Sequence, residues 1–165
     1  MGTEIISKEK VVSNFDKNAV AVQCIEYYGN GDAYDEAQIT PRLIEEILSE
    51  ISTGISVYLF LDPDKECDWM EVLSDGTWLS LGCYFYRNGK NEYYVTYNSD
   101  FADITTQIEK ADYSDQSVWT KLESGGQSPV SKLEAITNME IGVKAVEYFI
   151  RTGELYPGID WMHQF

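Results

Sequence analysis

Residues 69–97 read WMEVLSDGTWLSLGCYFYRNGKNEYYVTY, and this stretch decides the fold. It contains Asp75-Gly76 and Asn88-Gly89, dipeptides that accept the positive φ angles of tight hairpin turns. Strand-forming residues flank both dipeptides. The pattern therefore predicts three consecutive antiparallel strands, over residues 69–73, 77–86 and 91–97.

The second of these hairpins is crowded with aromatic side chains. They are Tyr84, Phe85, Tyr86, Tyr93, Tyr94 and Tyr97. Because successive side chains of a strand point to opposite faces, about half of them must lie on each face. One face is then core, and the other exposes tyrosines, which are enriched in protein interfaces. A hairpin buried on both faces and a solvated, tyrosine-lined sheet remain open as alternatives.

The chain before the hairpins indicates a strand, a helix and another strand. Residues 19–28 are rich in strand formers, and the turn residues 29–32 follow them. Thr40 offers an N-cap and Pro41 the first helical position, and apolar residues then recur at helical spacing. Residues 56–61 are apolar on both sides, as in a central strand covered on both faces.

The chain directly after the hairpins has weaker signals. Residues 99–116 scatter apolar side chains among acids, which is consistent with an irregular loop or a short helix. Residues 118–123 have the composition of another strand, and residues 124–129 that of a flexible connection.

A second helix is indicated near the C-terminus. Thr137 and Glu140 have the spacing of a capping box, and Gly153 suits a left-handed C-terminal cap. After Pro157 the chain reads as a turn into a short final strand. Together these elements predict an α+β fold, with a single antiparallel sheet of about five to seven strands and two main helices packed on it.

The composition combines an ordinary hydrophobic content with a strong excess of acid. Hydrophobic residues make up 44% of the chain, and 12 Lys and Arg stand against 28 Asp and Glu, a formal net charge of -16. This charge repels phosphate backbones and anionic membranes, so it argues against direct binding to nucleic acid or membrane and favours a cationic partner. Solubility alone is the alternative explanation of the acidity.

The start of the chain and its cysteines favour a cytoplasmic location. Met1-Gly2-Thr3 leads into no basic region with an apolar run behind it, and no apolar stretch approaches the roughly 20 residues that span a bilayer. Cys24, Cys67 and Cys83 are odd in number and widely spaced, as expected of reduced thiols rather than of a disulfide framework or a zinc site.

The sequence offers few groups for catalysis or metal binding. His163, the one histidine, lies two residues from the C-terminus, where fraying is common. Residues 62–68 place carboxylates at alternate positions, like the opening of a calcium loop, but Cys67 and Leu73 stand where that loop needs Gly and Glu. Gly125-Gly126 lacks the other residues of a phosphate-binding loop. We therefore expect no enzyme, no metal and no cofactor, although an unmarked pair of carboxylates among the 28 acids stays open.

The last third of the chain carries a recognisable arrangement. Pro129 is followed by Ile136-Thr137, by the segment 145–153 (AVEYFIRTG), and by Pro157-Gly158-Ile159-Asp160-Trp161. This helix, with a Phe-x-x-Thr-Gly-like end and then a Pro and a Trp, resembles the Immunity protein 1 family, the antidotes encoded beside bacterial polymorphic toxins. The resemblance covers residues 129–161. The spacing departs from the family pattern, because Glu154-Leu155-Tyr156 separates the glycine from the proline.

The resemblance implies a single immunity-type domain over residues 1–165 that binds and neutralises a toxin domain, a nucleic-acid deaminase or nuclease with a basic cleft. A nucleic-acid mimic that inhibits another basic protein, and a small enzyme, are the alternatives. We expect the contacts to come from acidic segments outside the helices, at Asp62, Asp64, Glu66, Asp68, Trp69, Asp100, Asp103, Asp112, Tyr113 and Asp115.

Overall fold

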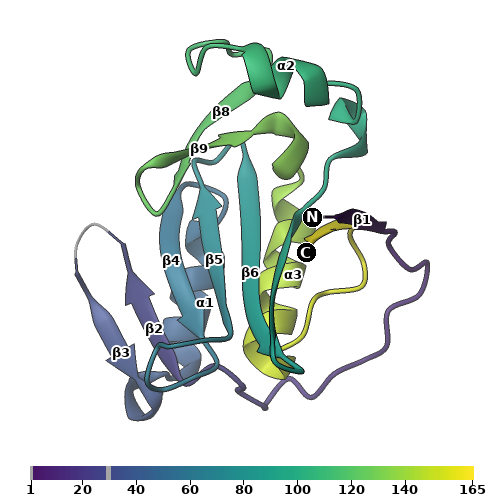
Figure 1. Cartoon of the computed structure of the whole chain (residues 1–165). Helices are drawn as coiled ribbons and strands as arrows, with labels where there is room; N and C mark the ends of the chain where they lie inside the picture. Colours follow the sequence, from purple (N-terminus) through teal and green to yellow (C-terminus); the bar gives the residue numbers. More distant parts are fainter. Residues whose placement is uncertain (1, 29–30) are drawn as a thin grey trace.

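The computed structural model describes residues 2–28 and 31–165, which build a large antiparallel sheet with helices behind it (Figure 1). Within the described residues this sheet has eight strands. In order across the sheet they are β1 (Thr3–Ile6), β10 (Trp161–Gln164), β7 (Lys90–Thr96), β6 (Leu79–Arg87), β5 (Trp69–Ser74), β4 (Ile55–Phe60), β2 (Cys24–Tyr27) and β3 (Ala33–Asp35). A separate sheet pairs β8 (Trp119–Ser124) with β9 (Ser128–Ser131).

The central meander is the one that the sequence predicts. β5, β6 and β7 pair in consecutive antiparallel order, with strand ends one or two residues from the expected positions. Between β6 and β7, Asn88 and Gly89 have φ angles of 54° and 75°. Two positive φ angles give a two-residue turn the twist that matches its flanking strands, which is why Asn-Gly fixes this hairpin.

The α+β class is confirmed, but the expectation of one sheet with five to seven strands is wrong. β1 and β3 have no readable pattern, because β1 is exposed at all four positions and β3 has only three residues. Residues 118–123, expected as a strand, form most of β8 in the separate sheet, and residues 124–129 form its turn and the start of β9 rather than a flexible connection. Pro129 is tolerated in β9 because this strand has a free edge.

The first expected strand is shorter than predicted. Of residues 19–28, only Cys24–Tyr27 form a regular strand. Before it, the Ala21 N–H donates to the Ile150 carbonyl at 2.8 Å, so the end of the last helix satisfies this backbone in place of a strand ladder. Residues 29 and 30 of the expected turn lie outside the described residues.

The helices follow their capping residues. α1 (Pro41–Glu50) begins as predicted, with Thr40 Oγ1 accepting from the Leu43 N–H at 3.2 Å. α3 (Met139–Thr152) is capped by Asn138, so the expected capping box of Thr137 and Glu140 is wrong by one residue. The Asn138 side chain accepts from the N–H three residues later, as an N-cap does. The left-handed cap at Gly153 is confirmed.

The shorter helices complete the chain. α2 (Thr105–Lys110) and the 3₁₀ turn η2 (Ser99–Phe101) resolve the ambiguous segment 99–116 in favour of short helices, and the other 3₁₀ turns are η1 (Glu36–Gln38) and η3 (Lys132–Glu134). Figure 1 places α2 and the β8–β9 sheet together at one end of the large sheet. Across residues 2–28 and 31–165, every helix falls short of the length and apolar character that crossing a membrane requires.

The core lies between α1, α3 and one face of the large sheet, which we call the covered face (Figure 1). Alternate strand residues point into it and are fully buried, and Phe149 and Ile150 of α3 meet them. The sheet side of this core is Ile25, Val57, Leu59, Met70, Val72, Leu79, Leu81, Cys83, Phe85 and Trp161. We call the other face of the sheet the open face; none of the α-helices within residues 2–28 and 31–165 lies over it, but the β8–β9 sheet and η3 cover one end of it, where Leu73 packs with Leu122, Val130 and Ala135.

Candidate functional site

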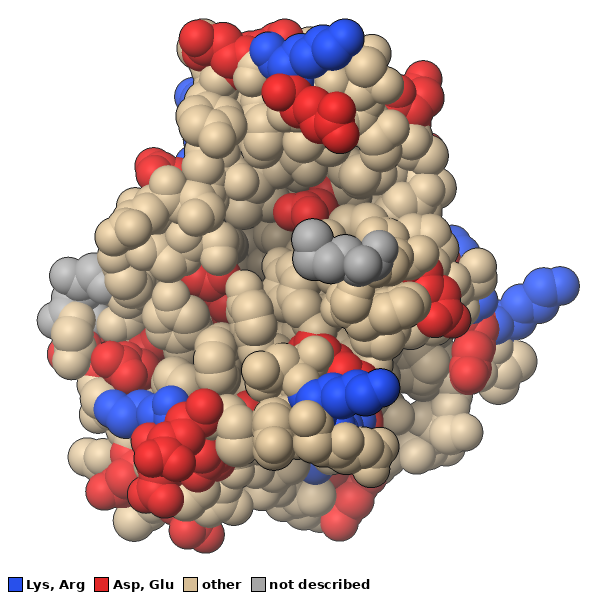
Figure 2. Space-filling view, viewed as in Figure 1, with Lys and Arg blue, Asp and Glu red and all other residues tan. Residues whose placement is uncertain are grey.

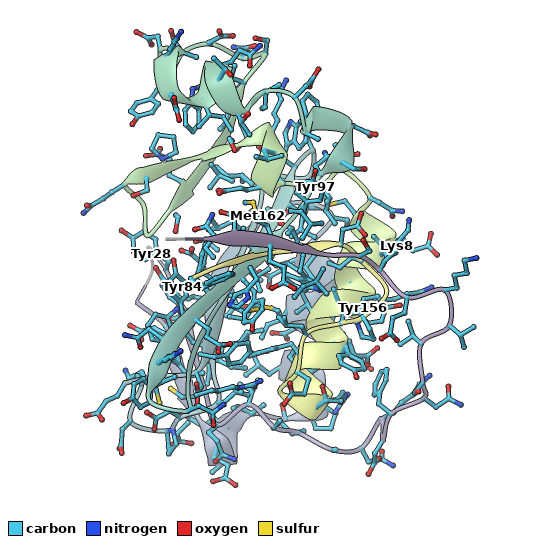
Figure 3. The ribbon with its side chains drawn as sticks, turned by 45° about the vertical axis from the view of Figure 1, so that its right-hand side comes forward. Lys8, Tyr28, Tyr84, Tyr97, Tyr156 and Met162 are labelled. Carbon is cyan, nitrogen blue, oxygen red and sulfur yellow. The ribbon has the colours of Figure 1, made fainter. Side chains whose placement is uncertain are left out.

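The open face carries a row of aromatic side chains that crosses four neighbouring strands. Successive side chains of a strand point to opposite faces, so the residues next to the buried core residues along each strand point to the open face. The row begins at Tyr28, directly after β2, and we define it as Tyr28, Tyr58, Phe60, Trp69, Tyr84 and Tyr93. Figure 3 shows Tyr28 and Tyr84 on the side of the sheet away from α3, whereas Tyr156 lies beside that helix.

The strand register brings these rings into contact. Phe60 pairs with Trp69, Trp69 with Tyr84, and Tyr84 with Tyr93. The ring centroids along this path are 6.0, 4.9 and 4.5 Å apart. Aromatic pairs at such distances contribute about 0.5–1.5 kcal/mol beyond the area that they bury. The row is therefore a preformed surface rather than a set of independent side chains.

Gly82 gives Tyr93 the space to lie flat against β6. A Cβ at Gly82 would stand 3.1 Å from Tyr93 Oη and 3.3 Å from Cε1, closer than ordinary van der Waals contact. A larger residue would push the tyrosine ring away from the sheet. The glycine in this strand marks a close approach, as glycines inside strands often do.

A buried carboxylate, Glu71, ties the β8–β9 turn to the open face. It is only 5% exposed, and its oxygens accept from Ser124 Oγ at 2.6 Å and from the Gly125 N–H at 2.8 Å. A buried carboxylate with two donors from the same turn is satisfied, so Glu71 positions the turn over the aromatic row.

A second carboxylate, Glu134 of η3, faces the same surface. Burial raises its pKa, and a hydrogen bond from Gln164 offsets part of that rise. Its backbone carbonyl accepts from Ser80 Oγ at 2.9 Å and from Thr96 Oγ1 at 2.6 Å, which fixes η3 to β6 and β7. Both carboxylates contribute negative potential to Tyr84 and Tyr93.

Three tyrosines of the row, Tyr58, Tyr84 and Tyr93, stay un-ionised at neutral pH. Burial, followed by the charge of Glu71, raises the pKa of Tyr58 to about 12 and also raises that of Tyr84. Burial, followed by the neighbouring Tyr84, raises the pKa of Tyr93. Neutral phenols present ring faces and hydrogen-bonding hydroxyls, so this chemistry suits contact with a ligand more than proton transfer.

A pocket with a volume of about 440 Å³ opens at one end of the row. Its walls are the loop residues Glu66, Cys67 and Asp68 on one side and Gln164 on the other, and its floor includes Trp69, Tyr84, Tyr86, Asn91 and Tyr93. Among the described residues that line it there is no lysine or arginine. Figure 2 views the molecule from this face and shows acidic side chains distributed over it.

The predicted contact residues of the first acidic segment divide into two kinds. Asp62 and Asp68 hold the loop: Asp62 accepts from three backbone N–H groups within it, and Asp68 Oδ1 accepts from the Tyr86 N–H at 2.9 Å. Backbone hydrogen bonds lower the pKa of Asp62. Asp64 and Glu66 are exposed, and Trp69 lies in the aromatic row.

The second acidic segment lies at the opposite end of the large sheet, near α2 (Figure 1). Asp112 and Asp115 accept from Ser114 and Ser117, and these hydrogen bonds lower the pKa of both carboxyls. Tyr113 is 68% exposed, with its ring edge-on to Trp119 at 5.0 Å. Asp100 and Asp103 are exposed. The structure therefore does not bring the two predicted segments together, and only the first borders the pocket.

Sequence reasoning misses Tyr58, Phe60, Glu71 and Glu134 as members of this site. Its hypothesis that one face of the hairpin exposes tyrosines agrees with Tyr86, which is 55% exposed, while Tyr84 and Tyr93 are half-buried. Residues 56–61 are predicted to be covered on both faces, and the structure buries Phe60 but leaves Tyr58 partly exposed. The alternation of aromatic Tyr58 and Phe60 with aliphatic Val57 and Leu59 is the signal in the sequence. No local signal marks the two glutamates, because their partners are distant in the chain.

His163 does not fray, contrary to expectation. It lies in β10, which is paired on both sides, and its ring stacks on Tyr94 with centroids 4.3 Å apart. Its Nε2 lies 3.9 Å from Glu92 Oε2. Tyr94 separates His163 from Cys83 in the strand register, so these two groups do not form a nucleophile–base pair.

The other candidate thiol, Cys67, is not activated either. Burial, with Asp68 and Asp62, raises the pKa of the Cys67 thiol to about 11.

The described part of the chain also offers no cluster of three or more His, Cys, Asp or Glu side chains arranged to hold a metal ion. What distinguishes the open face is its combination of aromatic rings and carboxylates. Its function has to be inferred from those residues, since no protein-family model, no curated protein and no solved structure matches this chain.

Proposed function

We propose that this chain is an immunity-type protein that binds and neutralises a toxin domain with a basic surface, by stoichiometric contact through the open face. The observation that carries the proposal is the aromatic row beside a pocket that no lysine or arginine lines among the described residues. The resemblance of residues 129–161 to the Immunity protein 1 family gives the partner its class. That class is a nucleic-acid deaminase or nuclease domain, produced by a bacterium that must protect itself.

The aromatic row supports binding to a protein. Half-buried tyrosine and tryptophan rings contribute large contact area at a small entropic cost, and such residues dominate binding energy at interfaces. The rings are already packed on one another, with Trp69 and Tyr84 4.9 Å apart, so little ordering remains to be done on association.

The charge supports a basic partner. A toxin that holds nucleic acid needs a positive cleft, and a protein with a net charge of -16 is attracted to such a cleft. Complementary potentials raise association rates to about 10⁸ M⁻¹ s⁻¹ or more at low salt. To neutralise a toxin, the protein must leave only a small fraction of the toxin unbound. We therefore expect a Kd in the nanomolar range or below, which corresponds to a binding free energy of about -12 kcal/mol.

The proposed role includes no reaction. Glu71 accepts from Ser124 Oγ and the Gly125 N–H. Of the carboxylates that line the 440 Å³ pocket, Asp68 accepts from the Tyr86 N–H and Glu92 from the Tyr94 hydroxyl, so both are held by neighbouring groups of the protein. Inhibition by contact, with the toxin active site blocked or its nucleic acid excluded, matches the open face better.

The test uses the full-length chain and the product of the neighbouring toxin gene. We expect the two proteins to co-elute in a one-to-one complex and the complex to lose toxin activity. Failure to co-elute contradicts the proposal. Equal binding to an unrelated basic DNA-binding protein would instead favour a nucleic-acid mimic.

Two charge-reversed variants locate the contact surface. Asp64→Lys/Glu66→Lys changes the loop beside the pocket, and Asp100→Lys/Asp103→Lys makes the same charge change at the opposite end of the sheet. All four side chains are exposed, so both variants should fold. We expect only the first to slow association and to flatten its salt dependence. The reverse result would place the contact near α2.

A further inference from the structure

We propose that the pocket at the end of the aromatic row receives one arginine side chain of the partner protein. The proposed function supplies the protein that carries this arginine, whereas the preference of the pocket for a guanidinium group can be tested without it. The pocket lies between the loop 66–68 and Gln164, over the rings of Trp69, Tyr84 and Tyr93.

The charges around the pocket select a cation. Glu66 and Asp68 stand on its loop side, and the buried Glu71 and the half-buried Glu134 add negative potential to Tyr84 and Tyr93. The cations nearby are already engaged: Lys65 is paired with Glu26 at 3.4 Å, and Arg87 lies over the Phe85 ring and is paired with Glu154 at 3.3 Å. A cationic group that enters the pocket therefore meets carboxylates and aromatic rings, the two kinds of group that bind it.

The floor favours arginine over lysine. A guanidinium is planar and weakly hydrated, stacks on aromatic rings and binds carboxylates through two parallel donors. An ammonium keeps its water more strongly and makes no such planar contact. The phenols stay neutral, because burial raises the pKa values of Tyr84 and Tyr93, so the pocket keeps this aromatic character over the whole physiological pH range.

The pocket is held in shape before any ligand arrives. The Tyr86 N–H binds Asp68 Oδ1 at 2.9 Å, and Asp62 closes the loop through the N–H groups of Glu66 and Cys67. Gly82 leaves space for the Tyr93 ring. Its volume of about 440 Å³ is within the roughly 300–1,000 Å³ of sites that enclose small ligands. Such preorganisation lowers the entropic cost of binding one side chain.

The first experiment titrates the full-length chain with Nα-acetyl-arginine amide and follows the aromatic NMR resonances. Nα-acetyl-citrulline amide, which has the same length but an uncharged urea, is the matched probe. We expect the arginine probe to shift the ring resonances of Trp69, Tyr84 and Tyr93 with a Kd in the millimolar range. The citrulline probe should bind at least about tenfold more weakly. Equal binding of both probes, or shifts confined to Tyr113 and Trp119 at the far end, would overturn the proposal.

Neutral variants then identify the carboxylates. Glu66→Gln/Asp68→Asn keeps the side-chain shapes and the oxygen that accepts from Tyr86, and Asp100→Asn/Asp103→Asn makes the same charge change away from the pocket. The first should weaken arginine binding about tenfold while its unfolding curve stays unchanged, and the second should leave binding as it is. Equal losses in both would show that only net charge matters.

The partner separates this inference from the proposed function. If the toxin domain binds tightly and the Glu66→Gln/Asp68→Asn chain binds it equally well, the arginine pocket is wrong and the immunity function stands. If no toxin domain binds but arginine still exceeds citrulline about tenfold, the pocket stands and its partner is another arginine-bearing protein.

Discussion

The two faces of the large sheet use the same strands for different purposes. On the covered face, Val57 and Leu59 are fully buried and meet the helix residues Phe149 and Ile150. On the open face, their strand neighbours Tyr58 and Phe60 belong to the aromatic row, and α1 and α3 lie behind the sheet on its other side. The covered face is shaped to exclude water, whereas the open face combines half-buried rings with carboxylates. The comparison teaches that stability and binding are separated by the two-residue period of a strand.

The strongest test of this separation removes a large ring from each face. Phe149→Ala leaves a cavity in the core and should lower the free energy of unfolding by about 3–5 kcal/mol. Tyr86→Ala, at a residue 55% exposed on the open face, should change it by less than about 0.5 kcal/mol. Urea unfolding followed by circular dichroism measures both. Similar losses for the two variants would mean that the open face is part of the core.

The next effect concerns the attachment of the β8–β9 sheet to the open face. Glu71→Ala leaves Ser124 Oγ and the Gly125 N–H without their acceptor, and should cost about 1–3 kcal/mol. Hydrogen exchange at Gly125 should accelerate more than exchange in β6. Glu123→Ala, at an exposed carboxylate one residue before Ser124, is the control and should change little. Unchanged exchange at Gly125 would contradict the anchoring role of Glu71.

The covered face was largely readable in the sequence, because its signals are local. The Asn88-Gly89 turn and the Thr40 cap depend on neighbouring residues, and each forms as expected. β1 was not readable, since its partner β10 is at the other end of the chain and its own residues are exposed. The predicted length of strand 19–28 was wrong for a similar reason, because the end of α3 accepts a hydrogen bond from the Ala21 N–H that a longer strand would have used in its ladder.

The open face was less predictable, because acidic side chains look alike in a sequence. Asp62 and Asp112 stand out as exposed acids, yet both accept hydrogen bonds within their own turns. In the sequence Glu71 looks like an acid on the polar side of a strand. Its donors come from a turn much later in the chain, and Ser124 follows Glu71 by 53 residues. Hydrogen-bond partners of this kind are set by the fold, so charge patterning alone does not separate structural acids from binding acids.

A smaller effect is the pH dependence that Glu134 gives to the stability of the fold. Burial raises the pKa of Glu134 above 4.5, so the folded state holds its proton to higher pH than the unfolded chain does. Stability must then fall as pH rises from about 4.5 through the folded pKa, since the folded state binds more protons in that window. Glu134→Gln should remove this loss and raise the free energy of unfolding at pH 7, by less than Glu71→Ala lowers it.

The measurement is a set of urea unfolding curves between pH 4 and pH 8 for the natural chain and the Glu134→Gln variant. Glu140→Gln, at an exposed glutamate of α3, is the matched control and should reproduce the natural pH profile. If the stability of the Glu134→Gln variant still falls as the pH rises over the same window, the loss comes from another group.

The finest comparison uses one tyrosine on each face. Burial raises the pKa of Tyr58 on the open face and of Tyr94 on the covered face to about 12, and the next contributions come from Glu71 and Glu92 respectively. At pH 11 a phenol with a pKa near 10 is about 90% ionised, whereas these two should be only about 10% ionised. Glu71→Gln should increase the ionisation of Tyr58 alone, and Glu92→Gln that of Tyr94 alone, in ¹³Cζ NMR titrations. We expect each glutamate to act only on the tyrosine of its own face. A variant that shifted the pKa values of both tyrosines would show that the two faces are electrostatically coupled through the sheet.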